Sequence, residues 1–337
     1  MKEIIYAIFL SFFLCGLCGN AEAKKKKEVK KAIKREVQTP YDKLFKGKKA
    51  FTVNGLMKMH LMAGKVYAEF PIELLNRDLA LTSSIEDISD NGEGVVGQFA
   101  GRVNQFRFTL QDSMLQARLV RRYGVKNTGM GKNADQIIER SNTPGIFQSY
   151  KILAYTPDKK AVVVDMTELF LESSRLTNPF PSYAGNSLYG FVQRIHKFQS
   201  QRSELLGICG NDNSMSVHCN LGFNVDRLVL GSFMQAKDVP VSVTVNKILM
   251  LLPEDPMRPR LADSRIGVNA IIQTELPDVC QGIKTYYITK RWRIEPVDEI
   301  RYKQGEMVDV KKPIVFYIDT LMPDSWIKYV KAGAEAW

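Results

Sequence analysis

The chain has few of the side chains that bind catalytic metals, with three histidines and five cysteines among 337 residues. A catalytic zinc site needs about three protein ligands and one open coordination position. His60, His196 and His218 lie far apart in the sequence, and no HExxH motif places two histidines on one helix face. The GxSxG and P-loop motifs are also absent. We therefore expect no catalytic, cofactor-binding or metal-binding residue in this chain.

Long apolar runs are equally scarce, and the one that occurs lies at the N-terminus. It extends from Ile4 to Leu17 behind Lys2, and Ala21-Glu22-Ala23 supplies the small-x-small pattern of a cleavage site. We interpret residues 1–23 as a secretory signal peptide. A transmembrane anchor is the alternative, but the run is shorter than the roughly 20 residues of a spanning helix. We therefore expect an exported protein that is periplasmic, outer-membrane associated or extracellular.

Positive charge is concentrated just after this run. Lys24–Arg35 contains eight basic residues and one acidic residue, in a chain with a net charge of +11. Such a block of like charges repels itself and stays solvated, which favours a flexible basic linker over residues 24–37. The alternative is an arm that binds an anionic surface or nucleic acid. For an exported chain we expect no nucleic acid partner and at most weak contact with an anionic membrane surface.

The segment after the expected cleavage site keeps three cysteines. Cys209 and Cys219 flank the turn-rich stretch Gly210–Asn213, so a disulfide across a hairpin is one interpretation in an oxidising compartment. Buried free thiols are the other. Either way, Cys280 is left without a partner.

Strand and turn patterns dominate the chain up to about residue 300 and predict a mainly β (α+β) fold. Three hairpins are expected, each with a short turn that contains glycine, aspartate or proline. Asp165 and Glu168 have the spacing of a capping box that opens a short helix. The expected strands are 56–62 with 65–70, 106–110 with 115–120, 152–155 with 161–164, an alternating segment from Val241 to Leu252, and 285–293.

The last forty residues predict a different architecture. Lys312–Asp319 is a short apolar, β-branched and aromatic run, which is typical of a buried strand. Trp326–Trp337 carries apolar residues at spacings of three and four, as in an amphipathic helix that Asp324 or Ser325 could cap. A strand and helix of this kind need further elements to bury their faces. We therefore expect residues 299–337 to be the incomplete α/β start of another domain.

One short stretch, Met257–Gly267, is dense in arginine. Its charged residues can form charge-assisted and bidentate contacts, and its glycine permits a sharp turn. The favoured interpretation is a structural clasp in which the aspartate pairs with an arginine and holds a crossing segment onto the next domain. The alternative is contact with a catalytic cleft. The residues with this possible interdomain role are Arg258, Arg260, Asp263, Arg265 and Gly267.

Four strings of residues together resemble one known family. They are TPYDKLFKGKK at 39–49, MRPRLADSRIG at 257–267, KRWRIEP at 290–296 and KKPIVFYID at 311–319. These strings resemble the exported zinc-dependent metalloproteases common in Bacteroidetes. The resemblance implies two N-terminal domains of unknown function, followed by a metzincin-like protease domain. It also implies that zinc is expected only in a full-length family member, because the zinc-binding helix has no counterpart here.

The resemblance and the residue patterns give one expected organisation. Residues 38–92 would form a small N-terminal β domain and residues 93–298 a larger β-rich domain. The chain would then be the non-catalytic N-terminal portion of an exported metalloprotease. It would support, orient or restrain the protease domain, or bind a protein or peptide substrate. The alternative is a self-sufficient β-rich binding module of the cell envelope without an enzymatic partner.

Overall fold

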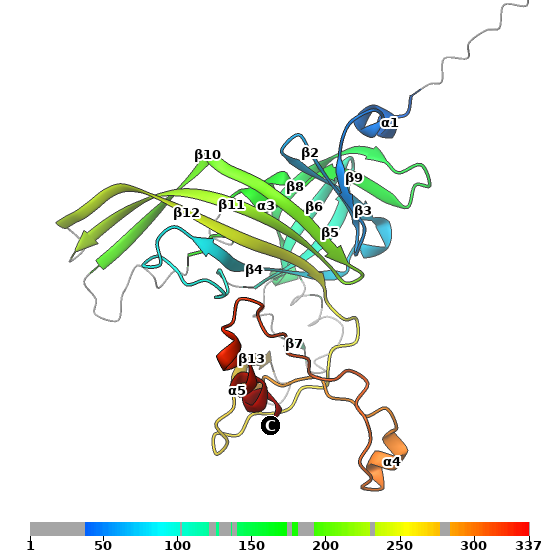
Figure 1. Cartoon of the computed structure of the whole chain (residues 1–337). Coiled ribbons are helices and arrows are strands. Elements are labelled where there is room, and N and C mark those ends of the chain that lie inside the picture. The colour runs from blue at the N-terminus through cyan, green and yellow to red at the C-terminus, as the bar shows by residue number, and fades with distance from the viewer. Residues whose placement is uncertain are drawn as a thin grey trace, which may run out of the picture. The chain divides into compact units, whose positions relative to one another are not determined.

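The computed structural model describes residues 38–101, 103–120, 126–127, 136, 140–173, 177–180, 192–229, 233–276 and 284–336. The expected signal peptide, the basic linker and Cys280 lie outside these residues. An antiparallel sheet of eleven strands dominates, in the order β1-β2-β3-β9-β8-β6-β5-β4-β12-β11-β10 (Figure 1). The mainly β prediction is therefore confirmed. The strands are β1 (Phe51–Val53), β2 (Lys58–Met62), β3 (Lys65–Pro71), β4 (Asp78–Ile88), β5 (Asn104–Gln111), β6 (Met114–Val120), β8 (Gly145–Tyr155), β9 (Ala161–Asp165), β10 (Val192–Asn211), β11 (Ser214–Val229) and β12 (Phe233–Leu251).

The remaining elements are short. A second sheet has the order β14-β13-β7 and is formed by β7 (Lys126–Asn127), β13 (Ala270–Leu276) and β14 (Lys284–Thr289). The helices are α1 (Pro40–Phe45), the 3-10 turn η1 (Ile72–Leu74), α3 (Thr167–Leu171), α4 (Glu299–Lys303) and α5 (Asp324–Glu335).

The three predicted hairpins are confirmed as β2–β3, β5–β6 and β8–β9. In the first, Ala63 and Gly64 have φ values of 51° and 71°. Positive φ at both positions is typical of the two-residue turn whose twist matches that of paired strands. This turn fixes the register and places Lys58 opposite Glu69. The sequence pattern therefore determined not only these strands but also which side chains face each other.

Residues 38–92 do not form a sheet of their own. β3 pairs with β9, and β4 lies between β5 and β12. Strands from both sides of the expected boundary at residue 92 thus alternate within one sheet. The hydrophobic pattern of a strand predicts a buried face but not its neighbour, so the shared sheet was not visible in the sequence.

The sheet curls so that its two ends approach each other. α3 packs against β3 near one end of the strand order and against β10 at the other. The backbone N–H of Leu56, in the β1–β2 connection, donates to the carbonyl of Asn211 at the end of β10 (2.7 Å). Gly55 makes this contact possible, because a Cβ there would lie 2.8 Å from the Asn211 oxygen.

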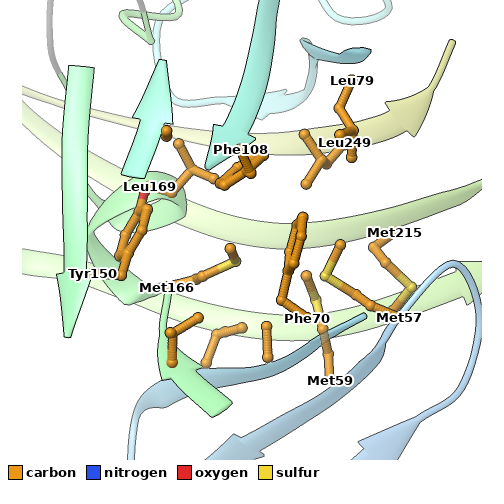
Figure 2. Packing of buried hydrophobic residues seen from close by; sticks show 14 of the residues in the cluster. Met57, Met59, Phe70, Leu79, Phe108, Tyr150, Met166, Leu169, Met215 and Leu249 are labelled. Atoms are coloured by element: carbon orange, nitrogen blue, oxygen red, sulfur yellow. The ribbon is translucent and has the colours of Figure 1, made fainter. Parts of the chain in front are cut away.

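The main core lies on the inner face of this curled sheet. Phe70 and Phe108 contact each other with ring centroids 4.8 Å apart, and Figure 2 shows methionines packed around Phe70. Met57 and Met215 fill the space on one side. Unbranched methionine side chains adapt to the irregular gap that a curled sheet leaves.

A buried lysine and a buried thiol secure α3 to the sheet. Lys247 Nζ donates to the Glu172 carbonyl (2.9 Å), and Cys219 Sγ donates to the Phe170 carbonyl (3.3 Å). Both acceptors belong to the C-terminal end of α3, where carbonyls lack partners within the helix. Burial lowers the pKa of Lys247 to about 8 and raises the pKa of Cys219 to about 11.

Four sequence-based predictions were wrong, and the first concerns the cysteines. Cys209 and Cys219 are free thiols. In the β10–β11 register Cys209 lies opposite Ser216, so Cys209 is exposed on one face while Cys219 is buried on the other. A disulfide cannot join two such positions, because adjacent residues along a strand point to opposite faces.

The other three corrections concern one expected strand and the N-termini of two helices. Lys312–Asp319 forms no strand, since a strand exists only where a neighbour supplies backbone hydrogen bonds. The helix after it is confirmed as α5, but neither Asp324 nor Ser325 caps it, and Pro323 precedes its first residue. Helix α3 is also present without the expected capping box, and Asp165 Oδ1 accepts from the Thr167 N–H (3.0 Å) instead.

Candidate functional site

The arginine-rich motif lies along the outer side of β14. The Thr289 N–H donates to the Arg260 carbonyl (2.9 Å), and the Ala262 N–H donates to the Tyr287 carbonyl (2.8 Å). The motif thus extends the small sheet through its backbone. A further contact comes from the guanidinium of Arg291, which donates to the Arg258 carbonyl (2.8 Å).

The charged side chains of the motif remain at the surface. Asp263 pairs with Arg265, its neighbour two positions on, and the closest contact is 2.6 Å. This pair holds a turn within the motif rather than joining two separate segments. The side chains of Arg258 and Arg260 form no ion pair with any residue that the structure describes. Gly267 does not have positive φ, and a Cβ there would meet nothing within 4 Å.

The whole region after Leu251 exposes its apolar side chains. Among residues 252–336 whose side chains are described, none is buried. Trp326 is 65% exposed and Val330 39%, although both belong to the apolar face of α5. Single exposed apolar residues are ordinary, but a series of large ones marks an interaction surface. Large members that are more than half exposed include Leu261, Ile266, Tyr287, Trp292, Ile294, Val297, Ile300, Tyr302, Met307, Val315, Phe316, Tyr317, Leu321, Trp326 and Tyr329.

A polar pocket of about 570 Å³ lies in the sheet region, beside α1, the β1–β2 connection and the β8–β9 turn. Its central group is the buried carboxylate of Glu69. Tyr41 Oη donates to Glu69 Oε1 (2.6 Å), His60 Nε2 lies 3.0 Å from the same oxygen, and Lys58 Nζ lies 3.3 Å from Oε2. On the far side of the imidazole, Thr52 Oγ1 lies 2.8 Å from His60 Nδ1.

The charges of this network are set by burial and hydrogen bonding together. Burial alone would raise the pKa of Glu69, but hydrogen bonds from His60 and Tyr41 outweigh it, and the pKa lies below its ordinary value. Burial and the bond to Glu69 raise the pKa of Tyr41, so the phenol stays protonated and donates. Because the ionised carboxylate only accepts, the contact with Glu69 places a proton on His60 Nε2, which donates to the carboxylate.

A second buried carboxylate anchors the loop after β4. Glu93 accepts from His196 Nε2 (2.8 Å) and from Arg227 Nε (3.0 Å), and it lies 3.2 Å from Arg194 Nε. Asp90 also pairs with Arg227. Burial would raise the pKa of Glu93, but the bond from His196 and the nearby cations hold it below its ordinary value. The network therefore attaches the loop to β10 and β11 electrostatically.

The same loop contains Gly92, Gly94 and Gly97, the spacing of a dinucleotide-binding GxGxxG motif. In that motif a helix follows the glycines and directs its N-terminus at the pyrophosphate. Here turns and an isolated bridge follow, and the next regular element is β5. The spacing therefore has no dinucleotide-binding context in this fold.

All three histidines of the chain pair with a glutamate. Besides His60 and His196, His218 Nδ1 lies 2.9 Å from Glu86 Oε2. Over the described residues, no three His, Cys, Asp or Glu side chains form a group that could hold a metal ion. Nor does any helix in the described part of the chain have the length and apolarity to cross a membrane.

Neither buried carboxylate was predicted from the sequence. The position of Glu69 was within reach of the sequence, because the Ala63-Gly64 turn sets it opposite Lys58. Glu93 gave no such signal, since it lies more than a hundred residues from His196 and Arg227 in the sequence. Only the pairing of β4 with β12 and of β11 with its neighbours brings these groups together.

The fold and these networks define a mainly β protein with one large curled sheet. Two regions match known families, both described as domains of unknown function: residues 38–88 match DUF5118 and residues 97–297 match DUF5117. The second match covers more than half of the chain, which therefore belongs to the DUF5117 family. No curated protein and no solved structure matches the chain.

Proposed function

We propose that the chain is the non-catalytic N-terminal portion of an exported zinc metalloprotease. In this proposal residues 252–336 dock against the protease domain, and the curled sheet supports, orients or restrains that domain. The observation that carries the proposal is the exposed apolar surface of this region, which includes residues 299–336, where the sequence resembles the start of a metzincin-like domain.

The distribution of side chains supports docking rather than catalysis. Trp326 and Tyr329 on α5, and Phe316 before it, are each about two-thirds exposed, so three large aromatic side chains are in contact with water. Aromatic side chains also contribute most of the energy of typical protein interfaces. Hydrolysis would require a metal to lower the pKa of bound water to about 7, and the sequence contains no HExxH helix to hold one.

Solvent access at the tryptophans tests the docking surface. Trp292 and Trp326 are exposed, and the third tryptophan of the sequence is Trp337. In the chain alone we expect red-shifted fluorescence, efficient acrylamide quenching and fast amide hydrogen exchange over residues 284–336. In a longer product, read in frame beyond residue 337, the same amides should become protected.

Two results would contradict the proposal. Slow exchange over 284–336 in the chain alone, equal to that of β11 and β12, would favour the self-sufficient envelope module. Zinc-dependent hydrolysis of an unstructured protein such as casein by the chain alone would contradict its non-catalytic role.

A further inference from the structure

The lining of the pocket at Glu69 includes apolar residues as well as a buried carboxylate. Leu56 and Met57, which line the pocket, are buried, and Pro71, Pro157 and Ala161 add apolar surface. Glu69 contributes its carboxylate from β3 with only 5% of the residue exposed. A cavity of about 570 Å³ with this lining is large enough for an amino-acid side chain and part of its backbone.

The two oxygens of this carboxylate differ in their partners. Oε1 is engaged by Tyr41 and His60, whereas Oε2 has a single ionic partner among the described residues, the Lys58 ammonium at 3.3 Å. The Lys58 side chain is 42% exposed, so it can rotate into solvent without leaving a cavity. Oε2 is therefore the less engaged of the two carboxylate oxygens.

The remaining charges of the pocket favour a cation over an anion. Glu73 and Asp158 add two carboxylates to that of Glu69, and Lys58 and Lys160 supply two ammonium groups. The lining is thus negative by one charge. An anion would also have to approach a buried carboxylate, which is strongly unfavourable in a partly desolvated site.

We propose that this pocket binds the side chain of a lysine or arginine in a peptide. The apolar stem would lie against the apolar residues of the lining, and the cationic head would reach Glu69 Oε2. Lysine and arginine are the residues that combine an apolar stem with a charged head. This inference does not rest on the proposed function, because the pocket belongs to the sheet and not to residues 252–336.

Binding of small capped amino acids to the intact chain tests this assignment. The probes are the Nα-acetyl methylamides of lysine and arginine, and the matched control is that of norleucine, which has nearly the same stem without the charge. Calorimetry or ligand-observed NMR should show at least about tenfold tighter binding of the cationic probes, a difference of roughly 1.4 kcal/mol. Equal binding of norleucine would overturn the proposal.

Lys58→Met separates a cation site from an anion site. Removing the competing ammonium should tighten binding of the lysine probe several-fold, because Oε2 then has no other ionic partner. An anion site would show the opposite result, with weaker binding of acetate or inorganic phosphate in the variant. Glu69 keeps its hydrogen bonds with Tyr41 and His60 in this variant, and binding is compared at a temperature where melting curves show the variant folded. Unchanged or weaker binding of the lysine probe would contradict the proposal.

Glu69→Gln should abolish the preference for the cationic probes. The matched control is Glu93→Gln, which alters the other buried, histidine-paired carboxylate and leaves the pocket unchanged. Both variants are compared at a temperature where melting curves show them folded. If Glu93→Gln lost the preference equally, the effect would be one of general stability and the assignment would be wrong. Failure of these tests would leave the solvent-access test of the docking region unaffected.

Discussion

Residues 39–251 and residues 252–336 both contain many large apolar side chains, but they place them in opposite environments. In the first region Phe70, Phe106 and Phe108 are fully buried in the core of the curled sheet. In the second region Phe316 and Trp326 are mostly exposed. Burying an aromatic side chain contributes on the order of 2–3 kcal/mol, so the first region obtains stability that the second does not.

The charged groups of the two regions show the same contrast. Glu93 is buried and is surrounded by His196 and two arginines, whereas Asp263 and Arg265 pair at the surface. Buried ion pairs are costly to break because one partner remains as an uncompensated charge, whereas exposed pairs contribute little. The sheet is therefore stabilised by its own contacts, whereas the region after Leu251 leaves its large apolar side chains exposed, which is the surface that the proposed protease domain would cover.

The largest expected effect comes from a matched pair of aromatic substitutions. Phe108→Ala removes a ring packed against Phe70 and should lower the free energy of unfolding by about 3–5 kcal/mol. Phe316→Ala removes an exposed ring and should change the free energy of unfolding by less than about 0.5 kcal/mol. Urea unfolding monitored by circular dichroism measures both. A large loss of stability in Phe316→Ala would show that aromatic side chains stabilise both regions alike.

A second pair of substitutions compares the charged groups. Glu93→Gln leaves the cations around it without a full counter-charge. It should lower the free energy of unfolding by about 3 kcal/mol at pH 7. Glu306→Gln, which disrupts an exposed pair with Arg301, should change stability by less than about 0.5 kcal/mol.

The stabilisation that Glu93 provides should decrease in acid. Because the folded-state pKa of Glu93 lies below its unfolded value, the stabilisation is complete above the unfolded pKa. It is lost as the pH falls through the lower, folded-state pKa. The gap between Glu93→Gln and the unmodified chain should therefore narrow in acid, as chemical denaturation at pH 7 and pH 4 would measure. A constant gap would show that Glu93 acts by packing alone.

The smallest expected effect concerns Lys247. Its pKa of about 8 in the folded chain means that, between pH 8 and the ordinary value of 10.5, the unfolded state binds more protons. Stability should therefore rise with pH through this group. Cys219, with a pKa of about 11 against 9.0, acts in the opposite direction above about pH 9.

The measurement compares the unmodified chain with Lys247→Met between pH 7.5 and 9. Between these pH values the free energy of unfolding of the unmodified chain should rise by about 1 kcal/mol relative to the variant. This value follows from integrating the difference in bound protons between the unfolded and folded states. Urea midpoints across this range provide the readout. Parallel pH profiles for the two proteins would mean that the Lys247 ammonium is not desolvated as the structure places it.

Local elements of the sheet could be predicted because their signals are local. Ala63-Gly64 specifies a tight turn, and the alternation of Val241, Val243 and Val245 specifies a strand with one buried face. The prediction was wrong where an element depends on a distant partner. Lys312–Asp319 has the composition of a strand but does not pair with another described strand. A disulfide between Cys209 and Cys219 was one interpretation of the sequence, but the two side chains lie on opposite faces of the sheet.

The sequence by itself determined the β-rich class, the hairpins and their turns, and the amphipathic helix at 324–335, because each follows from neighbours a few residues apart. The tertiary structure alone decided that strands from both family-matched segments share one sheet, and that Glu69, Glu93 and Lys247 are buried beside their partners. The physical reason is that a side chain's environment depends on which strands become neighbours. That choice rests on the sum of many weak contacts across the whole sheet rather than on any local pattern.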